Sequence, residues 1–483
     1  MNSENSAVMS QTEAYSFSGS FIRGETLYGF WNVVLKIISI FNSFLVISFL
    51  SVYQFGVYKL ILSFVAVVSS FLFDGLNGVV INDIGRFLGE NNVSSAKKLF
   101  REYAVIKITL GVALAVVVFI GSNTVAQYYG KDIGNYIRLV SFIFIIDVFQ
   151  TIQATFFTAR ISFSAVAAPS LIEFSRLVML VGYGFSYGLT PMSLLVIYVV
   201  SQLCALLFSS FHFLKEYRRH FLSVSASKQR LLYKIIVSYG KWPVLKGYVK
   251  SITENLRLWL IKFFINTEAV ALFSLASGLV SLVQSVFPLN VLTSLIPREI
   301  QDKERLRVIF QRGMKYVGVI GLILFLFGFF FFPPLVGLLF PRYQPAISLF
   351  RIMLLIIPLY GFLKITGAFL IAFREQKFIF TRFPLTGVIN VVLAFSLLPF
   401  IGLWGAAIEY VSSYIFTTLL FYWYVVRLQP QLSLRLADFF SFDSYDRKFL
   451  ENSFYHTLRL IRNYATFSGY GPKSPSPPSS PQT

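Results

Sequence analysis

Charged side chains are scarce in this sequence. Only 13% of the 483 residues are Asp, Glu, Lys or Arg, whereas a soluble domain usually carries about 25%. Apolar residues make up 56% of the chain and aromatic residues 18%, including 54 Phe, and the mean hydropathy is +0.68. A chain with so little polar surface is predicted to lie mostly in a membrane, and a soluble enzyme is excluded.

Cysteine and histidine are also rare. Cys204 is the single cysteine and lies in an apolar run, so no disulfide framework is expected. The three histidines are His212, His220 and His456, which lack the spacing of metal ligands. We therefore expect no metal site and no cofactor.

Motifs for common membrane and hydrolytic chemistry are missing as well. The sequence contains no G-x-x-x-x-G-K-[ST] loop and no H-E-x-x-H. The loops that are predicted to face outward are too short for a catalytic domain. The protein is therefore predicted not to be an enzyme, and transport would draw on an ion gradient, the substrate gradient or removal of product.

Long apolar stretches predict an all-α polytopic membrane protein with about twelve transmembrane helices. The stretch at 236–264 is the least regular because charged residues interrupt it. The predicted spans are 26–50, 58–82, 104–127, 137–159, 164–187, 191–214, 236–264, 269–296, 314–340, 346–372, 378–399 and 402–426.

Basic residues alternate between the predicted loops. Clusters of Lys and Arg follow the second, sixth, eighth and tenth spans, with Arg382 counted in the last of them, while the other side holds little beyond Lys131, Arg138 and Arg342. Because cytoplasmic loops are enriched in Lys and Arg, both termini are predicted to be cytoplasmic. The net charge of +20 is spread over these loops and does not form one patch, so nucleic acid is not an expected partner.

The spans divide into two predicted lobes. A cytoplasmic segment 1–25 precedes a six-helix lobe 26–214, and a basic linker 215–235 leads to a second six-helix lobe 236–427. The tail 428–483 ends in a Pro/Ser-rich stretch that is predicted to be disordered. Residues 56–77 and 269–290 align without gaps, as a repeat of two similarly oriented lobes would require.

The seventh span carries the strongest candidate site. On a helix, Lys246, Lys250 and Arg257 fall within about 40° of arc and over about 16 Å of depth, with Glu254 at the border of this face. Ionisable residues inside a span are costly and usually functional. We expect this stripe to line a water-filled cavity for an anion; the alternative is a helix on the membrane surface whose lysines reach the headgroups.

Other spans add candidate cavity residues. The predicted substrate cavity contains Lys36, Lys246, Lys250, Arg257 and Lys364, and the polar or ion-coupling candidates are Asn32, Asp74, Asn77, Glu254 and Asn290. Possible carboxylate partners for Lys36 are Asp74, Asp147, Glu173 and Glu409, although Glu173 is expected to pair with Arg176 three residues later. Because cations outnumber nearby acids, the cavity suits a phosphate or another anion better than an organic cation.

Two segments resemble Wzx-like polysaccharide flippases. The first is FGVYKLILSFVAVVSSFLFDGLN at 55–77 followed by NDIGRFLGE at 82–90, which resembles the second span and next loop of that family. The second runs from Tyr343 to about Arg427 and carries the pattern of Asn390, Pro399, Gly402, Gly405, Ala406 and Ala407. The resemblance extends over about residues 20–427, and the Pro-rich tail departs from it.

This resemblance implies a member of the multidrug/oligosaccharidyl-lipid/polysaccharide exporter superfamily. The implied fold is a V of two six-helix bundles, with the first, second, seventh and eighth spans around a central cavity. The implied function is alternating-access transfer of an undecaprenyl-pyrophosphate-linked oligosaccharide across the bacterial inner membrane, for O-antigen lipopolysaccharide, capsule or exopolysaccharide. The implied partners are this lipid-linked oligosaccharide and membrane lipids, together with a polysaccharide polymerase and a chain-length regulator.

Three alternatives remain open on the sequence. A multidrug or organic-ion exporter of the same fold would be expected to have an acidic cavity. A membrane glycan polymerase or ligase would need a large external loop, and a purely structural scaffold would not need charges inside its spans.

The charged stripe can be tested by labelling. In a Cys204→Ser background, cysteines that replace Lys246, Lys250 and Arg257 should react with small water-soluble thiol reagents in intact membranes, because this face meets water. Cysteines on the opposite face of the same helix should not react. Equal protection at all positions would favour the surface helix instead.

Overall fold

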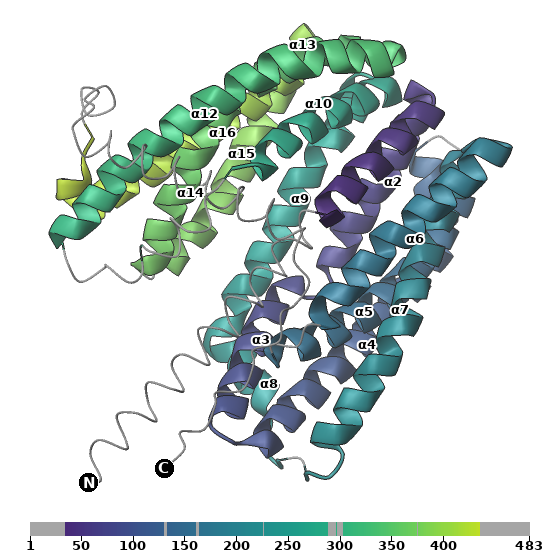
Figure 1. Ribbon diagram of the computed structural model, residues 1–483, viewed down its shortest axis with the longest axis vertical. Coiled ribbons are helices and arrows are strands. Elements are labelled where there is room, and N and C mark those ends of the chain that lie inside the picture. The colour runs from purple at the N-terminus through teal and green to yellow at the C-terminus, as the bar shows by residue number, and fades with distance from the viewer. Residues whose placement is uncertain are drawn as a thin grey trace, which may run out of the picture.

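The computed structural model describes residues 34–129, 133–160, 164–225, 227–287, 296, 303–373 and 375–434. Within these ranges the regular secondary structure is helical, without a β-strand. Figure 1 shows the helices as two groups that meet along the middle of the molecule. The all-helical character predicted from the apolar spans is confirmed for this part of the chain.

The N-terminal half contains seven long helices in the described ranges. The first is Val34–Phe49, and the others are α2 (Val52–Ser70), α3 (Asp74–Gly89), α4 (Val93–Tyr129), α5 (Gly134–Ala159), α6 (Ser164–Tyr187) and α7 (Pro191–Phe221). A short helix α8 (Leu231–Ile235) and a π-helical turn Ile236–Gly240 then lead into α9 (Lys241–Phe264).

The C-terminal half repeats this pattern of long helices. Its members are α10 (Thr267–Ser285), α12 (Lys303–Leu339), α13 (Pro345–Met353), α14 (Ile356–Ala372), α15 (Gln376–Ile401) and α16 (Leu403–Leu428). A one-turn helix at Pro341–Tyr343 joins α12 to α13, and another at Pro430–Leu432 follows α16.

Membrane-spanning character is strong in the described residues. Nine helical segments there are long and apolar enough to cross a membrane, and Val34–Phe49 is a shorter apolar helix. The two other predicted spans coincide with α6 and with α9. Helix α9 carries six charged residues, which are Lys241, Lys246, Lys250, Glu254, Arg257 and Lys262. The protein is thus a multi-pass membrane protein, and the count of twelve spans stays a prediction.

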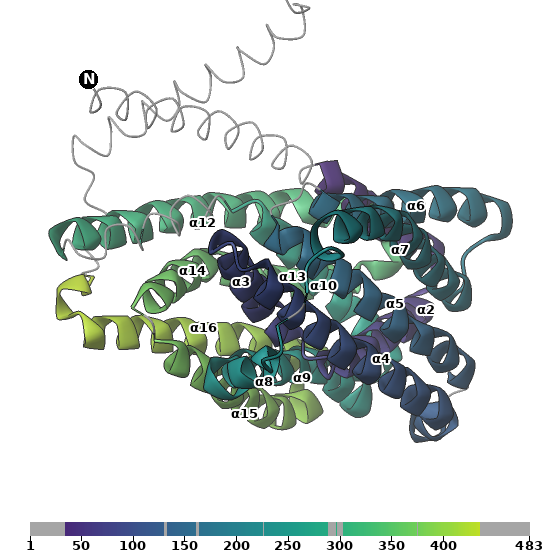
Figure 2. The ribbon, with the colours of Figure 1, turned by 90° about the horizontal axis from the view of Figure 1, so that it is seen from below.

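Helices α2, α9 and α10 connect the two groups. Helices α4 to α7 pack on one another, as do α12, α14, α15 and α16, while α2 packs on both α9 and α10. Figures 1 and 2 both show α12, α14 and α16 on one side of the molecule and α4 to α7 on the other. Helix α9 packs on α2, α3, α10 and α15, although Val244 and Ile261 are its only buried residues.

Two of the predicted spans are broken helices. Helix α2 begins with a capping box between Ser51 and Gln54 and ends at Ser70. Phe73 then takes a left-handed conformation with φ of 58°, and α3 starts at Asp74. The tenth predicted span is also divided, into α13 and α14, but the residues between them, Leu354 and Leu355, keep right-handed helical angles. A non-glycine residue in the left-handed conformation of Phe73 is uncommon, which explains why the apolar pattern did not predict the break in the second span.

The two groups touch closely at one end of the bundle. The Tyr343 hydroxyl donates to the Leu50 carbonyl at 3.3 Å, and the rings of Phe55 and Tyr343 meet edge to face, as do those of Phe44 and Phe340. Burial raises the pKa of Tyr343 to about 12, although Arg342 opposes the shift, so the hydroxyl stays protonated as a donor. This end carries the connections that are predicted to face outward.

Gly56 allows the closest approach at this contact. A Cβ atom at Gly56 would lie 2.1 Å from the Thr267 carbonyl oxygen. Gly56→Ala should therefore separate α2 from α10 and lower stability by about 1–3 kcal/mol, as overpacking usually does. The thermal unfolding midpoint in detergent should fall, and a cysteine at Tyr343 in a Cys204→Ser background should react faster with thiol reagents. Gly182→Ala is the matched control, since its Cβ would meet nothing within 4 Å; equal behaviour of both variants would contradict the prediction.

Candidate functional site

The larger of two adjoining cavities lies among helices of the C-terminal group. It has a volume of about 570 Å³ and is formed by α9, α10, α14, α15 and α16, with Lys59 reaching it from α2. We name it the C-lobe cavity. Its neutral polar side chains are Thr253, Ser274, Ser277, Ser281, Gln284, Thr386, Asn390, Tyr410, Ser413, Tyr414 and Thr417.

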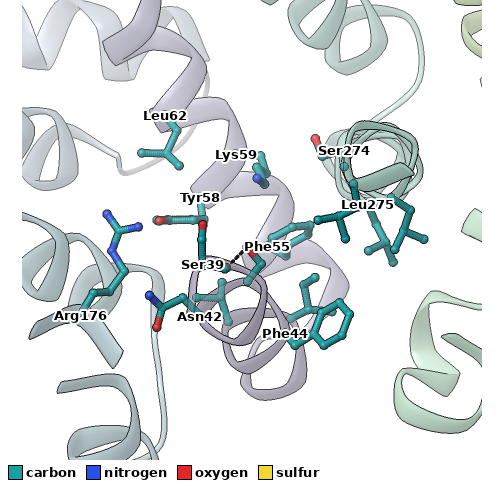
Figure 3. Close-up of a pocket in the computed structure, with 16 residues that line it drawn as sticks. Ser39, Asn42, Phe44, Phe55, Tyr58, Lys59, Leu62, Arg176, Ser274 and Leu275 are labelled. Carbon is teal, nitrogen blue, oxygen red and sulfur yellow. Dashed lines mark hydrogen bonds between the residues drawn. The ribbon is translucent and has the colours of Figure 1, made fainter. Parts of the chain in front are cut away.

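The second cavity, the interface cavity, lies between the first helix, α2, α6 and α10 and has a volume of about 250 Å³. In Figure 3, Tyr58 and Lys59 come from α2 and Asn42 comes from the first helix. Arg176 of α6 and Ser274 of α10 lie on opposite sides of these α2 residues. Lys59, Ser274 and Gly278 line both cavities. The two spaces therefore adjoin where the two groups of helices meet.

Cations dominate the walls of the C-lobe cavity. Its charged lining residues are Lys59, Lys250, Glu254, Arg257 and Arg382. The Lys250 ammonium nitrogen lies 3.9 Å from Glu254 Oε1. Arg176 lines the interface cavity. Its Nη1 atom lies 3.8 Å from Glu173 Oε1, so the pairing that their spacing predicted is confirmed.

Arg257 is neutralised by a carboxylate from another helix. Its guanidinium binds Glu409 of α16 in a bidentate manner, with Nη2 donating to Oε1 at 3.0 Å and Nε donating to Oε2. The two side chains are only 11% and 1% exposed, and the guanidinium lies 4.7 Å from the Tyr410 ring centre. With its amide nitrogen turned towards these acceptors, Asn390 donates to Glu409 Oε1 at 3.2 Å and to Ser413 at 2.6 Å. The pair and its hydrogen bonds connect α9, α15 and α16.

Lys59 and Arg382 have no such partner among the described residues. The Lys59 ammonium lies 5.3 Å from the Phe55 ring centre, and the Arg382 guanidinium lies 4.7 Å from Phe383 and 4.8 Å from Phe421. The Arg382 Nε atom is buried without a hydrogen-bond partner. Because an uncompensated charge in an apolar bundle is costly, these two side chains leave the cavity with a demand for an anion.

The charged stripe predicted for the seventh span is only partly in the cavity. Lys250, Glu254 and Arg257 line it. Lys246 does not line either described cavity and lies over the Phe383 ring at 5.7 Å. The packing of α9 between α3 and α15 disfavours the surface helix considered above.

Two other predicted cavity lysines lie elsewhere. The Lys36 ammonium donates to the Ser285 carbonyl at the end of α10, at 3.0 Å, and the exposed Lys364 lies 5.4 Å from the Tyr360 ring centre. Neither lines the C-lobe or the interface cavity. Glu409 was considered as a partner for Lys36, but it binds Arg257. Asn32 and Asn290 lie outside the described residues.

Asp74 and Asn77 belong to a separate polar network in the N-terminal group. Asp74 Oδ1 accepts from Lys107 of α4 at 3.0 Å, and Asn77 Oδ1 accepts from the Tyr103 hydroxyl at 2.8 Å. Lys107 is almost fully buried. These residues line neither the C-lobe nor the interface cavity, so their role in substrate or ion binding stays a prediction.

Sequence reasoning missed Lys59, Lys107 and Arg382. Lys59 and Lys107 lie within predicted spans and meet the same criterion that singled out Lys250. Arg382 was counted with a basic loop although it also falls within the span predicted at 378–399. The signal was thus present in the sequence for all three, but it did not indicate which cavity or partner each side chain would reach.

Comparisons with known proteins agree with this architecture. A family model described as "Polysaccharide biosynthesis protein" matches residues 45–347. No curated protein matches the chain.

Several solved structures share the fold at low sequence identity. An inward-facing multidrug resistance MATE family transporter of the MOP superfamily has a TM-score of 0.72 and 16% identity, over 82% of this chain and 94% of that one. The lipid II flippase MurJ in an inward closed conformation has a TM-score of 0.68 and 12% identity, over 86% and 89%. A MOP superfamily transporter from Pyrococcus furiosus, described by a binding pocket of reverse polarity, has a TM-score of 0.56 and 15% identity, over 85% and 94%. The chain therefore shares its fold with these transporters.

The buried pair of Arg257 and Glu409 can be tested with a double-mutant cycle. Arg257→Gln or Glu409→Gln alone leaves a buried charge without its partner, which usually costs about 3–5 kcal/mol. Each single variant should lower the thermal unfolding midpoint in detergent, and the double variant should lose less than the sum of the two. Glu90→Gln, which breaks a largely exposed pair with Arg86, should leave the midpoint unchanged. Strict additivity of the two single effects would contradict a direct interaction.

Proposed function

Since the chain belongs to the polysaccharide biosynthesis protein family, we propose that it is a flippase for a lipid-linked saccharide. The proposed substrate is an undecaprenyl-pyrophosphate-linked oligosaccharide repeat unit, moved across the bacterial inner membrane by alternating access. The product would serve O-antigen, capsule or exopolysaccharide synthesis. A polysaccharide polymerase and a chain-length regulator would be its partners.

The observation that carries this proposal is the pair of unpartnered cations Lys59 and Arg382. They come from opposite groups of helices, α2 and α15, and both line the C-lobe cavity. A pyrophosphate that leaves water loses its hydration, and charge-assisted hydrogen bonds from Lys and Arg would replace it. Arg257 contributes less to this role because Glu409 already neutralises it.

The neutral wall of the C-lobe cavity suits a saccharide. Hydroxyl and amide groups such as Ser277, Ser281 and Gln284 line the α10 side, and Thr386 and Thr417 line the opposite side. Such groups donate and accept hydrogen bonds and therefore complement sugar hydroxyls. The volume of about 570 Å³ lies in the range of roughly 300–1,000 Å³ that small-ligand sites usually occupy.

The contacts between the two groups support one access state. The end with Leu50 and Tyr343 is closed by a hydrogen bond and by edge-to-face rings. The lining of the C-lobe cavity includes Gln284 and Arg382. Gln284 lies near the last residue of α10 and Arg382 near the first turns of α15, at the ends of these helices that lie away from Leu50 and Tyr343. With the orientation predicted from the basic loops, this state would receive substrate from the cytoplasmic side.

The cavity charge favours a lipid-linked saccharide over an organic cation. One of the structural relatives is described as a multidrug transporter, so this alternative has a basis in the fold. However, four cations and one carboxylate line the C-lobe cavity, and Glu409 is already bound to Arg257. A cationic drug would meet repulsion from Lys59 and Arg382.

The role of these two residues can be tested in a strain that lacks the gene. Lys59→Gln and Arg382→Gln should each reduce surface glycan by about tenfold or more, because a hydrogen bond to a charged group is worth about 1.5–3 kcal/mol. Lys59→Arg should retain export. Lys246→Gln and Lys364→Gln serve as matched controls, since both remove a membrane lysine outside the two cavities and should export normally. Full export by the Lys59→Gln/Arg382→Gln double variant, at a wild-type level in the membrane, would contradict the proposal.

A further inference from the structure

A third cavity lies in the N-terminal group, away from both cavities described above. It has a volume of about 400 Å³ and shares no lining residue with the C-lobe or the interface cavity. We name it the N-lobe pocket. The ends of α3, α5 and α7 form much of its wall, through Gly85, Leu88, Gly89, Arg160, His220 and Phe221.

The polar side of the N-lobe pocket has more basic groups than one carboxylate can satisfy. Arg160 Nη1 lies 3.6 Å from Glu216 Oε2, and His220 Nε2 lies 3.4 Å from the same oxygen. The Arg160 Nη1 atom is buried and makes no hydrogen bond. A buried guanidinium nitrogen without an acceptor is costly, so a further anion at Arg160 would stabilise this arrangement.

The pocket lies where apolar helix gives way to charged residues. The apolar run of α7 ends at Leu214 and is followed by KEYRRH at 215–220. Beside the pocket, an aromatic cluster packs around Phe221, with members Phe100, Phe156, Phe213 and Tyr217. Phe100, Phe156 and Phe221 are buried in this cluster, so the helix ends around the pocket are held by a packed core. The basic loops predict that this is the cytoplasmic side, where anionic lipids attract basic residues.

Two glycines keep the pocket open without being needed for helix packing. A Cβ at Gly89 would meet nothing within 4 Å, and one at Gly85 would meet only the Ala159 carbonyl oxygen at 3.8 Å. The space beside this face of α3 is therefore available to a ligand. Leu88 and Phe221 supply an apolar wall next to Arg160 and His220, which fits a molecule with an anionic head and an apolar body.

We propose that the N-lobe pocket binds the phosphodiester headgroup of an anionic membrane lipid. Arg160 and His220 contact the phosphate, Leu88 and Val93 contact the adjoining glycerol and acyl region, and Glu216 competes with the lipid for the two basic groups. This site is separate from the transport cavities, so it does not depend on the identity of the transported substrate.

Lipid binding to the full-length protein in detergent tests this proposal. Native mass spectrometry and the thermal unfolding midpoint should both report binding of phosphatidylglycerol, with little effect of zwitterionic phosphatidylcholine. Arg160→Gln should weaken phosphatidylglycerol binding by about tenfold, since a charge-assisted hydrogen bond is lost. Glu216→Gln should strengthen binding, because it removes the competing carboxylate.

Two further variants keep the test decisive. Arg218→Gln removes the same charge from an exposed position on α7 outside the pocket and should bind phosphatidylglycerol normally. Gly89→Leu retains every charge but fills the pocket, so it should lose phosphatidylglycerol binding. This variant provides an independent test of the site if Arg160→Gln does not fold.

Other outcomes would overturn the proposal. Equal losses for Arg160→Gln and Arg218→Gln would indicate a diffuse basic surface. An equal stabilisation by inorganic phosphate would indicate a free-anion site without lipid. Lys59→Gln/Arg382→Gln should bind phosphatidylglycerol normally, so failure of the flippase proposal and failure of this one are distinguishable.

Discussion

The bidentate pair of Arg257 and Glu409 is the interaction on which the C-lobe cavity depends. It buries two opposite charges between α9 and α16, and Asn390 of α15 extends it by a hydrogen bond to the same carboxylate. An unpaired charge inside an apolar bundle is costly, and a partner of this kind offsets that cost. The pair therefore holds the helices around the cavity and removes one cation from its positive surplus.

What remains after this neutralisation defines the chemistry of the site. Lys59 and Arg382 are left without carboxylate partners in the described chain, on helices from opposite groups. A movement of one group against the other would change the distance between them, so an anion bound to both would be sensitive to the access state. Alternating access and recognition of an anionic headgroup are thus linked through the same two side chains.

Helix α9 combines two tasks that usually conflict. It packs against α2 through hydrogen bonds from Trp259 to Ser63 and from Ser251 to the Ala66 carbonyl, and it also presents Lys250 and Arg257 to the cavity. Its charges make it too polar for an ordinary lipid-exposed span. It packs on α2, α3, α10 and α15, and its Lys250, Glu254 and Arg257 face the cavity, where such charges are tolerated.

Local properties of the sequence determined the membrane class, the helical elements and the charged face of α9, because apolar run length and helical periodicity are properties of short segments. The partners of each charge required the tertiary structure. Arg257 and Glu409 are separated by 152 residues, and periodicity shows which face of a helix is polar but not which helix that face meets. For the same reason, periodicity did not show which predicted residues reach the cavity. Lys250 and Arg257 line it, whereas Lys36, Lys246 and Lys364 do not. Lys59 and Arg382 line it from α2 and α15, two helices that the sequence alone does not bring together.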